Sequence, residues 1–275
     1  MKQTDFEYDG RYLSDYGFVV CDFDTVSGIS EISAGSTITF EKVSRNNGKK
    51  FGLVHTKYTE CMTSTFDICK NPDIYDEANM VITLDEFRDI VRWLNRRSFN
   101  LFHFVSDDGG VDEIETSYHN ASFNISKLML GERLCGIRLN LETDRPFGFG
   151  EERVYAWSTD AKNEQHVIAD ISDEIGYTYP NVTILCKTSC NLILSNAETG
   201  CSSVIKNCSP GEMITMSGET NIIMSSMNGH DICNDFNFDF FTISNDIDRI
   251  QNTITVSHPC DIEIRYRPII KFTYL

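Results

Sequence analysis

One short run in the middle of the chain, Asp144–Gly150, constrains the fold more than any other stretch. Its proline cannot donate a hydrogen bond to a sheet, and its two glycines accept backbone angles that end regular strand pairing. The residues that follow, Glu151–Lys162, are polar and show no sustained period, so we take this region as the seam between two domains. Because 275 residues is close to the length at which a single core divides, we predict two domains, residues 1–145 and 146–275.

The pattern of the first domain predicts a mainly β structure with one helix. The segment Leu134–Glu142 alternates apolar and polar residues, as a strand with one buried face does. Thr83 and Glu86 form a capping box at the start of a helix predicted over Leu84–Arg97. The apolar stripe of this helix is Leu84, Phe87, Ile90, Val91 and Leu94. We therefore expect an antiparallel β-sandwich or barrel that carries a single α-helix.

A hairpin is predicted between Ser36–Lys42 and Phe51–Tyr58. Asn47-Gly48 is a strong turn signal, because both residues accept a positive φ. The connecting loop is basic in an acidic chain, so it can dock onto an acidic neighbour or remain an exposed tip. The candidate assembly-interface residues are Arg45, Asn46, Asn47, Gly48, Lys49 and Lys50.

The second domain shows short apolar segments at regular intervals, with turns between them and no helical period. This spacing predicts a β-sandwich or jelly roll. Its clearest strand is Cys260–Arg267, with Ile262, Ile264 and Tyr266 facing inward. The segment Phe236–Ile243 is predicted to be another strand, with three phenylalanines on one packed face.

Composition excludes several classes of function. The net charge of −17 leaves no basic stripe for a nucleic acid. No apolar run is long enough to span a membrane, and Met1–Gly10 has no signal-peptide pattern, so we expect a protein made in a cytosol without membrane insertion. The ten cysteines are therefore expected to be free thiols.

The sequence contains no recognisable catalytic, cofactor or metal motif, and we expect none of these sites. Cys186-x3-Cys190 and Cys201-x6-Cys208 lack the paired spacing of a zinc site. Asp231, Asp235 and Asp239 recur every four residues but lack the crowding of oxygen ligands that calcium needs.

Four aromatic residues after the central run leave two interpretations open. They could form a sugar-binding platform on the sandwich, or they could pack where the two domains meet. The candidate glycan-contact residues are Tyr155, Trp157, Tyr177 and Tyr179.

Taken together, the order of several short motifs resembles that of a known family. These motifs are Asp15-Tyr16-Gly17-Phe18, the hairpin at Asn47-Gly48 followed by Tyr58, Arg92-Trp93-Leu94-Asn95-Arg96, Leu139–Phe147, Gly176–Ile184, Gly211–Ser226 and Cys260–Pro268. Over nearly its whole length the chain resembles the distal tail protein (Dit) family of siphophages, bacteriophages with long non-contractile tails. Asp248–Asn252 departs from the family because it lacks a glycine that is often present in this turn.

The resemblance implies a structural virion protein at the phage tail tip, assembled in the cytoplasm of the bacterial host. Its N-terminal domain is expected to form a ring, usually a hexamer, that joins the tail tube protein to baseplate proteins or to a tail-associated fibre or lysin. Its C-terminal domain is expected to be a peripheral galectin-like, or carbohydrate-binding-module-like, β-sandwich. In some relatives this outer module contacts host glycans.

Two other functions stay open from the residues alone. A free carbohydrate-binding protein that recognises host cell-wall glycans would carry its ligand surface within residues 151–275. An acidic hydrolase would need a pair of carboxylates close in space, and the sequence does not single out such a pair. We favour the structural hub, which would act through its interfaces and not through catalysis.

Overall fold

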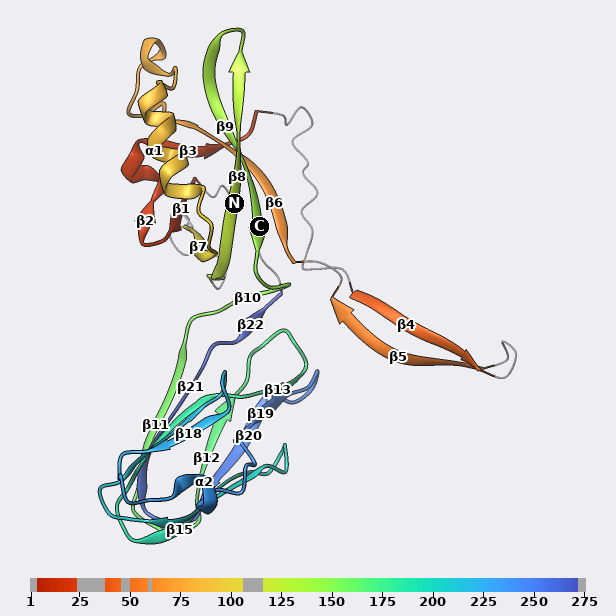
Figure 1. The fold of residues 1–275 in the computed structure, drawn as a ribbon, viewed down its shortest axis with the longest axis vertical. Coiled ribbons are helices and arrows are strands. Elements are labelled where there is room, and N and C mark those ends of the chain that lie inside the picture. Colours follow the sequence, from red (N-terminus) through yellow and green to blue (C-terminus); the bar gives the residue numbers. More distant parts are fainter. Residues whose placement is uncertain (1–3, 24–37, 46–49, 59–60, 106–115, 272–275) are drawn as a thin grey trace. The chain divides into compact units, whose positions relative to one another are not determined.

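The computed structural model describes residues 4–23, 38–45, 50–58, 61–105 and 116–271 (Figure 1). These residues are built mainly from β-strands, which confirms the predicted fold class. The chain divides into two compact units, Met1–Gly150 with Ile270–Leu275, and Glu151–Ile269. The first unit thus continues past residue 145 to Gly150 and includes the C-terminal end of the chain.

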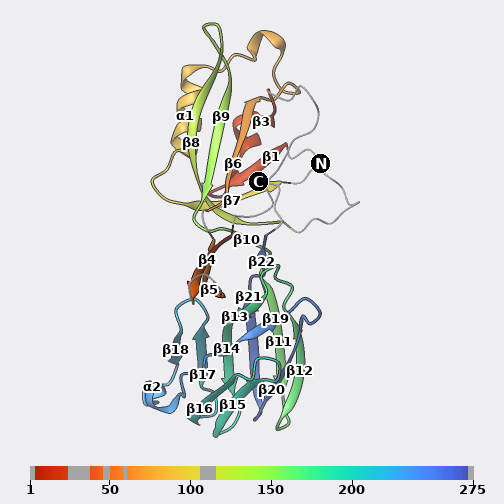
Figure 2. The same ribbon diagram turned by 90° about the vertical axis from the view of Figure 1, so that its right-hand side faces the viewer.

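The first unit contains one antiparallel sheet of seven strands in the order β2-β1-β7-β8-β9-β6-β3 (Figures 1 and 2). Its strands are β1 (Asp5–Tyr8), β2 (Arg11–Tyr12), β3 (Phe18–Cys21), β6 (Thr63–Lys70), β7 (Asn100–Val105), β8 (His119–Leu130) and β9 (Arg133–Thr143). Two 3-10 helices, η1 (Leu13–Tyr16) and η2 (Glu77–Asn79), lie in its connections. The predicted alternation along β9 is confirmed, because Ile137, Leu139 and Leu141 are all buried.

Aromatic side chains fill the core of the first unit. The ring of Phe6 stacks on Trp93, with 5.6 Å between the ring centroids, and meets Phe102 at 5.5 Å. The indole Nε1 of Trp93 donates a hydrogen bond of 2.9 Å to the backbone oxygen of Tyr8. A buried indole N–H needs such a partner, so this bond fixes the helix that carries Trp93 against β1.

The predicted helix is present as α1 (Leu84–Leu94), with the capping box of Thr83 and Glu86 formed. It ends three residues before the predicted end at Arg97, because the side chain of Asn95 turns to donate a hydrogen bond to the backbone oxygen of Phe123. The prediction that Leu84 belongs to the buried stripe is wrong. The buried face centres on Ile90 and includes Trp93, and Leu84 lies about a third of a turn away from it in solvent.

The second unit is a β-sandwich, as predicted. A five-stranded sheet in the order β11-β21-β14-β17-β18 and a four-stranded sheet in the order β12-β20-β15-β16 enclose one apolar core (Figure 2). The first sheet contains β11 (Arg153–Thr159), β14 (Asn181–Cys186), β17 (Met213–Ser217), β18 (Ile222–Ser225) and β21 (Cys260–Tyr266). The second sheet contains β12 (Glu164–Ala169), β15 (Cys190–Asn196), β16 (Ser202–Cys208) and β20 (Gln251–Val256). A short pair, β13 (Gly176–Thr178) and β19 (Ile243–Asn245), completes the unit.

Two predictions near the central run are wrong. We predicted that strand pairing would stop in the central run, but β10 (Gly148–Phe149) lies within it and pairs with β22 (Ile269–Ile270). We expected no strand in the polar stretch after it, but this stretch contains β11, which pairs along its full length with β21. The burial pattern of β11 explains the error. Its inward side chains include two half-buried aromatic residues, so the sequence lacks the aliphatic alternation that marks most strands.

The prediction of a strand over Phe236–Ile243 is also wrong. Regular pairing begins only at Ile243, and a four-residue helix, α2 (Ile232–Asp235), lies in a domain predicted to have none. The side-chain amide of Asn237 occupies the open edge of β16, where it accepts a hydrogen bond from the backbone N–H of Val204 and donates one to the backbone oxygen of Ser202. These side-chain bonds accompany one backbone bridge, between Ile205 and Phe236, and a hydrogen bond from the N–H of Asn237 to the backbone oxygen of Val204. The segment therefore follows the edge of β16 without forming a regular ladder.

Candidate functional site

The predicted hairpin is present as β4 (Ile38–Arg45) and β5 (Lys50–Tyr58), which pair antiparallel up to Arg45 and Lys50 (Figure 1). The four candidate residues at its tip, Asn46–Lys49, lie outside the described residues. The backbones of Arg45 and Lys50 face each other at the last described pair of the ladder. The structure therefore brings the two ends of the candidate loop together.

The hairpin forms a two-stranded sheet of its own within the described part of the chain. Apart from Thr39 and Tyr58, its described side chains are exposed. They include three large apolar residues, Ile38, Phe40 and Leu53, which are 43, 54 and 60% exposed. Because an isolated two-stranded hairpin has little independent stability in water, this surface is suited to packing against another chain.

The base of the hairpin is fixed to the first unit. The ring of Tyr58 meets Phe147 edge-on at 6.3 Å, and the ammonium group of Lys271 lies 5.8 Å from the centre of the Tyr58 ring. Phe147 in turn contacts Phe149 at 5.6 Å. Phe147 and Phe149 belong to the central run Asp144–Gly150, and Lys271 lies near the C-terminus of the chain.

The four candidate glycan-contact residues fall into two groups. Tyr155 and Trp157 lie on β11 and stack on each other with 6.2 Å between centroids, and Trp157 also stacks on His166 at 4.6 Å. The hydroxyl of Tyr155 donates a hydrogen bond to the backbone oxygen of Ala169. Both rings are half-buried and pack against the sandwich core.

Tyr177 and Tyr179 are instead exposed, at 67 and 50%. They line a pocket of about 510 Å³ together with Phe238 and Asp239. Phe238 is 65% exposed, so the prediction that it shares one packed face with Phe236 and Phe240 is wrong. The structure thus joins two of the four candidates to an aromatic residue that the sequence had assigned to the core.

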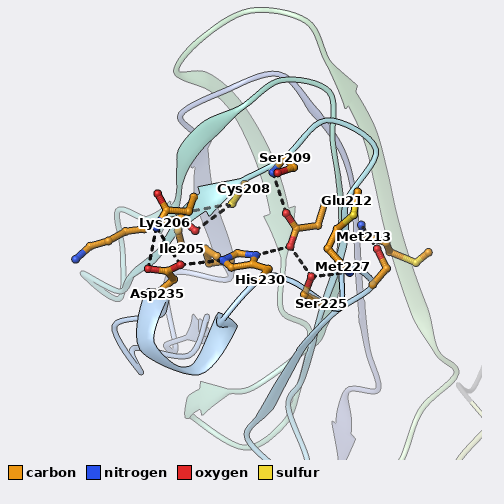
Figure 3. A network of polar contacts seen from close by, with 12 residues as sticks. Ile205, Lys206, Cys208, Ser209, Glu212, Met213, Ser225, Met227, His230 and Asp235 are labelled. Atoms are coloured by element: carbon orange, nitrogen blue, oxygen red, sulfur yellow. Dashed lines mark hydrogen bonds and ion pairs between the residues drawn. The ribbon is translucent and has the colours of Figure 1, made fainter.

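A buried network of polar side chains lies elsewhere in the second unit (Figure 3). The carboxylate of Glu212 has no solvent exposure, and it accepts hydrogen bonds from the backbone N–H of Ser209 at 2.8 Å and from the hydroxyl of Ser225. His230 contacts the same carboxylate through Nδ1 and lies 3.2 Å from Asp235 through Nε2. Because a carboxylate can only accept, Nδ1 of His230 must carry the proton.

Glu212 and His230 each stabilise the charged form of the other. Burial disfavours the charged form of His230, but the hydrogen bond and negative charge of Glu212 outweigh it, so the pKa of His230 is raised. Burial likewise opposes the charge on Glu212, yet the hydrogen bonds from His230, Ser225 and Ser209 lower its pKa. The network ties α2 to the sandwich. Since Glu212 is sealed from solvent and already holds three partners, it is not presented to a substrate.

The three aspartates that recur every four residues do not converge. Asp231 accepts from Asn234, Asp235 from Asn207, and Asp239 from the backbone of Ser202. Within the described ranges, no group of histidine, cysteine and acidic side chains is arranged to hold a metal ion.

Two family models match the chain and together cover most of it. Residues 1–145 match the phage tail protein N-terminal domain, and residues 147–266 match the phage tail C-terminal domain. The chain belongs to this family of phage tail proteins.

The fold of this tail protein is also found in a solved structure. The crystal structure of the Dit protein (gp 19.1) of phage SPP1, described as a paradigm of the hub adsorption apparatus in phages that infect Gram-positive hosts, matches with a TM-score of 0.64 and 16% identity. The match covers 97% of this chain and 99% of that chain. The predicted resemblance to the distal tail family is thus confirmed. A comparison with curated proteins gives no match.

The tail protein has no helix, among the residues described, that is long and apolar enough to cross a membrane. Sequence reasoning missed two of its features, the outward position of Phe238 and the pairing of Glu212 with His230. Residues 212 and 230 are too far apart in sequence for a local pattern to connect them. The recurring acids Asp231, Asp235 and Asp239 were the local signal near this network, and we had judged them too sparse for a calcium site.

Proposed function

We propose that this tail protein is a distal tail hub that closes into a ring of six copies through its β4–β5 hairpin. The ring would join the tail tube protein to baseplate proteins or to the tail-tip fibre or lysin, and so to host attachment. Its role would be carried by surfaces, with no residue that performs catalysis. The observation that carries the proposal is the hairpin itself, which exposes Ile38, Phe40 and Leu53 and is paired with no further strand in the described residues.

Charge supports a second copy of the chain as the partner of the hairpin. Residues 38–58 contain five basic residues and one acidic residue, in a chain whose net charge is −17. The hairpin is therefore a positive segment on a negative protein, and the body of a neighbouring copy offers the complementary charge. Head-to-tail contacts of this kind close into a ring when a whole number of copies completes one full turn, and otherwise they form an open filament.

Salt provides a further test of the same proposal. Repulsion between subunits that each carry −17 acts over tens of ångströms, where added salt screens it most. Charge pairs at the hairpin would lie within contact distance, where screening is weaker. We therefore expect the ring to be favoured at moderate over low ionic strength.

Deletion of Arg45–Lys50 tests the hairpin directly. Loop tips tolerate cuts well, so both units should stay folded while the ring is lost or weakened. Sedimentation velocity would measure assembly, and circular dichroism would measure folding. A deleted protein that forms rings as stable as those of the intact chain would contradict a role for the hairpin.

The open pocket beside Tyr177 and Tyr179 supports a second candidate function. A carbohydrate-binding surface on residues 151–269 would let the same protein contact host glycans at the tail tip. A glycan array probed with the full chain tests this function independently of ring formation. A chain that assembles but binds no glycan would support the hub alone.

A further inference from the structure

The rim of the pocket in the second unit combines two kinds of surface. Three large aromatic side chains, Tyr177, Tyr179 and Phe238, are each at least half exposed around it. Asp239 and Asn221 also line it. Its volume of about 510 Å³ is within the range of small-molecule sites.

Phe238 is held in an unusual conformation. Its φ of 57° is in the left-handed region, which a bulky aromatic residue rarely adopts. In this position the Phe238 ring is exposed, although an aromatic side chain would ordinarily gain by burial. Backbone strain of this kind persists only where the surrounding structure fixes it, and it is found most often at functional sites.

The residues on either side of Phe238 supply that fixation. The side chain of Asn237 bonds to the backbone of Ser202 and Val204, and Asp239 accepts a 2.8 Å hydrogen bond from the N–H of Ser202. The hydroxyl of Ser203 donates to the backbone oxygen of Asp239 at 2.6 Å. Both neighbours are thus fastened to β16, which holds the Phe238 ring beside the pocket.

The chemistry of the rim selects a ligand. Aromatic faces pack on apolar C–H surfaces, while a carboxylate and an amide bond to hydroxyl groups at the ligand's edge. Asp239 can accept further bonds, because each carboxylate oxygen has two acceptor positions. A pyranose ring has both an apolar face and hydroxylated edges. Residues 151–275 contain 17 acidic and eight basic residues, so a polyanionic ligand would be repelled.

We infer that the pocket rimmed by Tyr177, Tyr179 and Phe238 binds a pyranose unit of a neutral or amino-sugar glycan. Asp239 and Asn221 would orient the sugar through its hydroxyl groups. This inference deepens the second candidate function by assigning its site, and it does not depend on ring formation. It also predicts that Tyr155 and Trp157, which pack against the core, take no part in binding.

The test uses the full chain and a panel of neutral and amino-sugar oligosaccharides, including trisaccharides of glucose, galactose and N-acetylglucosamine. Saturation-transfer NMR detects binding, and titration calorimetry measures affinity. We expect at least one glycan to bind, and we expect Tyr177→Ala to weaken it about tenfold, as loss of a binding anchor does. Phe99→Ala, which removes an exposed ring of the first unit, should leave affinity unchanged.

Phe238→Asn separates a binding role from a packing role. Asparagine tolerates the left-handed region, so this variant should melt at the same or a higher temperature while losing affinity about tenfold. If Phe238→Asn lowers the melting temperature as much as a substitution in the core does, Phe238 is a packing residue and the inference is overturned. The inference also fails if no glycan of the panel binds, or if binding survives both Tyr177→Ala and Phe238→Asn.

Discussion

The Nδ1 atom of His230 lies 2.5 Å from Oε1 of Glu212, a carboxylate that is fully buried in the second unit. The two residues are 18 positions apart in sequence. Their contact joins the segment before β17 to the segment that leads into α2 (Figure 3). A buried charge pair of this kind makes the stability of the unit depend on pH.

The sign of that dependence follows from the two pKa shifts. Because the folded-state pKa of His230 is raised, its contribution is full below its ordinary value of 6.5 and is lost as pH rises through the folded pKa. Because the pKa of Glu212 is lowered, its contribution is present above its ordinary value of 4.5 and is lost as pH falls through the folded pKa. The pair should therefore stabilise the unit most between these two ordinary values.

His230→Gln should remove this pH dependence above about pH 6 and lower the free energy of unfolding by about 3 to 5 kcal/mol, because it leaves Glu212 buried without a counter-charge. The chain has two tryptophans, Trp93 in the first unit and Trp157 in the second. With fluorotryptophan incorporated, each unit gives its own ¹⁹F signal during denaturation. His55→Gln, at an exposed position on the hairpin, is the control. Equal pH profiles for the wild type and His230→Gln would rule out the pair as their cause.

Gly218 should not tolerate a side chain. A Cβ at this position would clash with the backbone oxygen of Tyr179, which cannot move without shifting the Pro180 peptide. We expect Gly218→Ala to destabilise the second unit by about 1 to 3 kcal/mol, as overpacking does. Gly229→Ala is a matched control, since a Cβ there meets no atom within 4 Å. Similar melting temperatures for the two variants would contradict the close approach at Gly218.

The aromatic core of the first unit should depend on Phe6. This buried ring contacts Trp93, Phe102 and Phe123, so Phe6→Ala removes many contacts at once. We expect a loss of about 3 to 5 kcal/mol in the unfolding of the first unit, followed through the Trp93 signal. Phe99→Ala, at an exposed site in the same unit, should change it by less than about 0.5 kcal/mol. A small effect of Phe6→Ala would place Phe6 outside the folding core.

The exposed apolar residues of the hairpin should matter for assembly and not for folding. The double variant Phe40→Ser with Leu53→Ser removes two of its large apolar side chains and leaves the strand ladder in place. We expect weaker self-association with an unchanged ¹⁹F unfolding profile. Ile247→Ser, at an exposed position in the second unit, should leave self-association as it is. If the double variant forms rings as stable as those of the wild type, the apolar surface of the hairpin has no role in assembly.

Elements with a local signal could be predicted from the sequence. The capping box of Thr83 and Glu86, the alternation along β9 and the hairpin signal of the Asn47-Gly48 sequence each identified an element, because the residues that decide it are neighbours in the chain. The end of α1 could not be predicted in this way. It depends on Asn95 bonding to Phe123, a residue on another element.

The candidate sites were less predictable for the same reason. Tyr177 and Tyr179 could be singled out as aromatic residues, but the rim they share with Phe238 depends on side-chain hydrogen bonds to the edge of β16. A period-2 pattern cannot distinguish Asn237 and Asp239 on the outer face of a strand from the same residues bonded to a sheet edge. Long-range contacts of this kind become visible only in the fold.

Sedimentation velocity of the purified full chain, at low and at moderate salt, tests the proposed hub most directly. The account predicts a discrete species near six times the 31.3 kDa chain mass, more populated at moderate salt, with a central hole in electron micrographs of the same sample. A chain that remains a monomer under both conditions would contradict it.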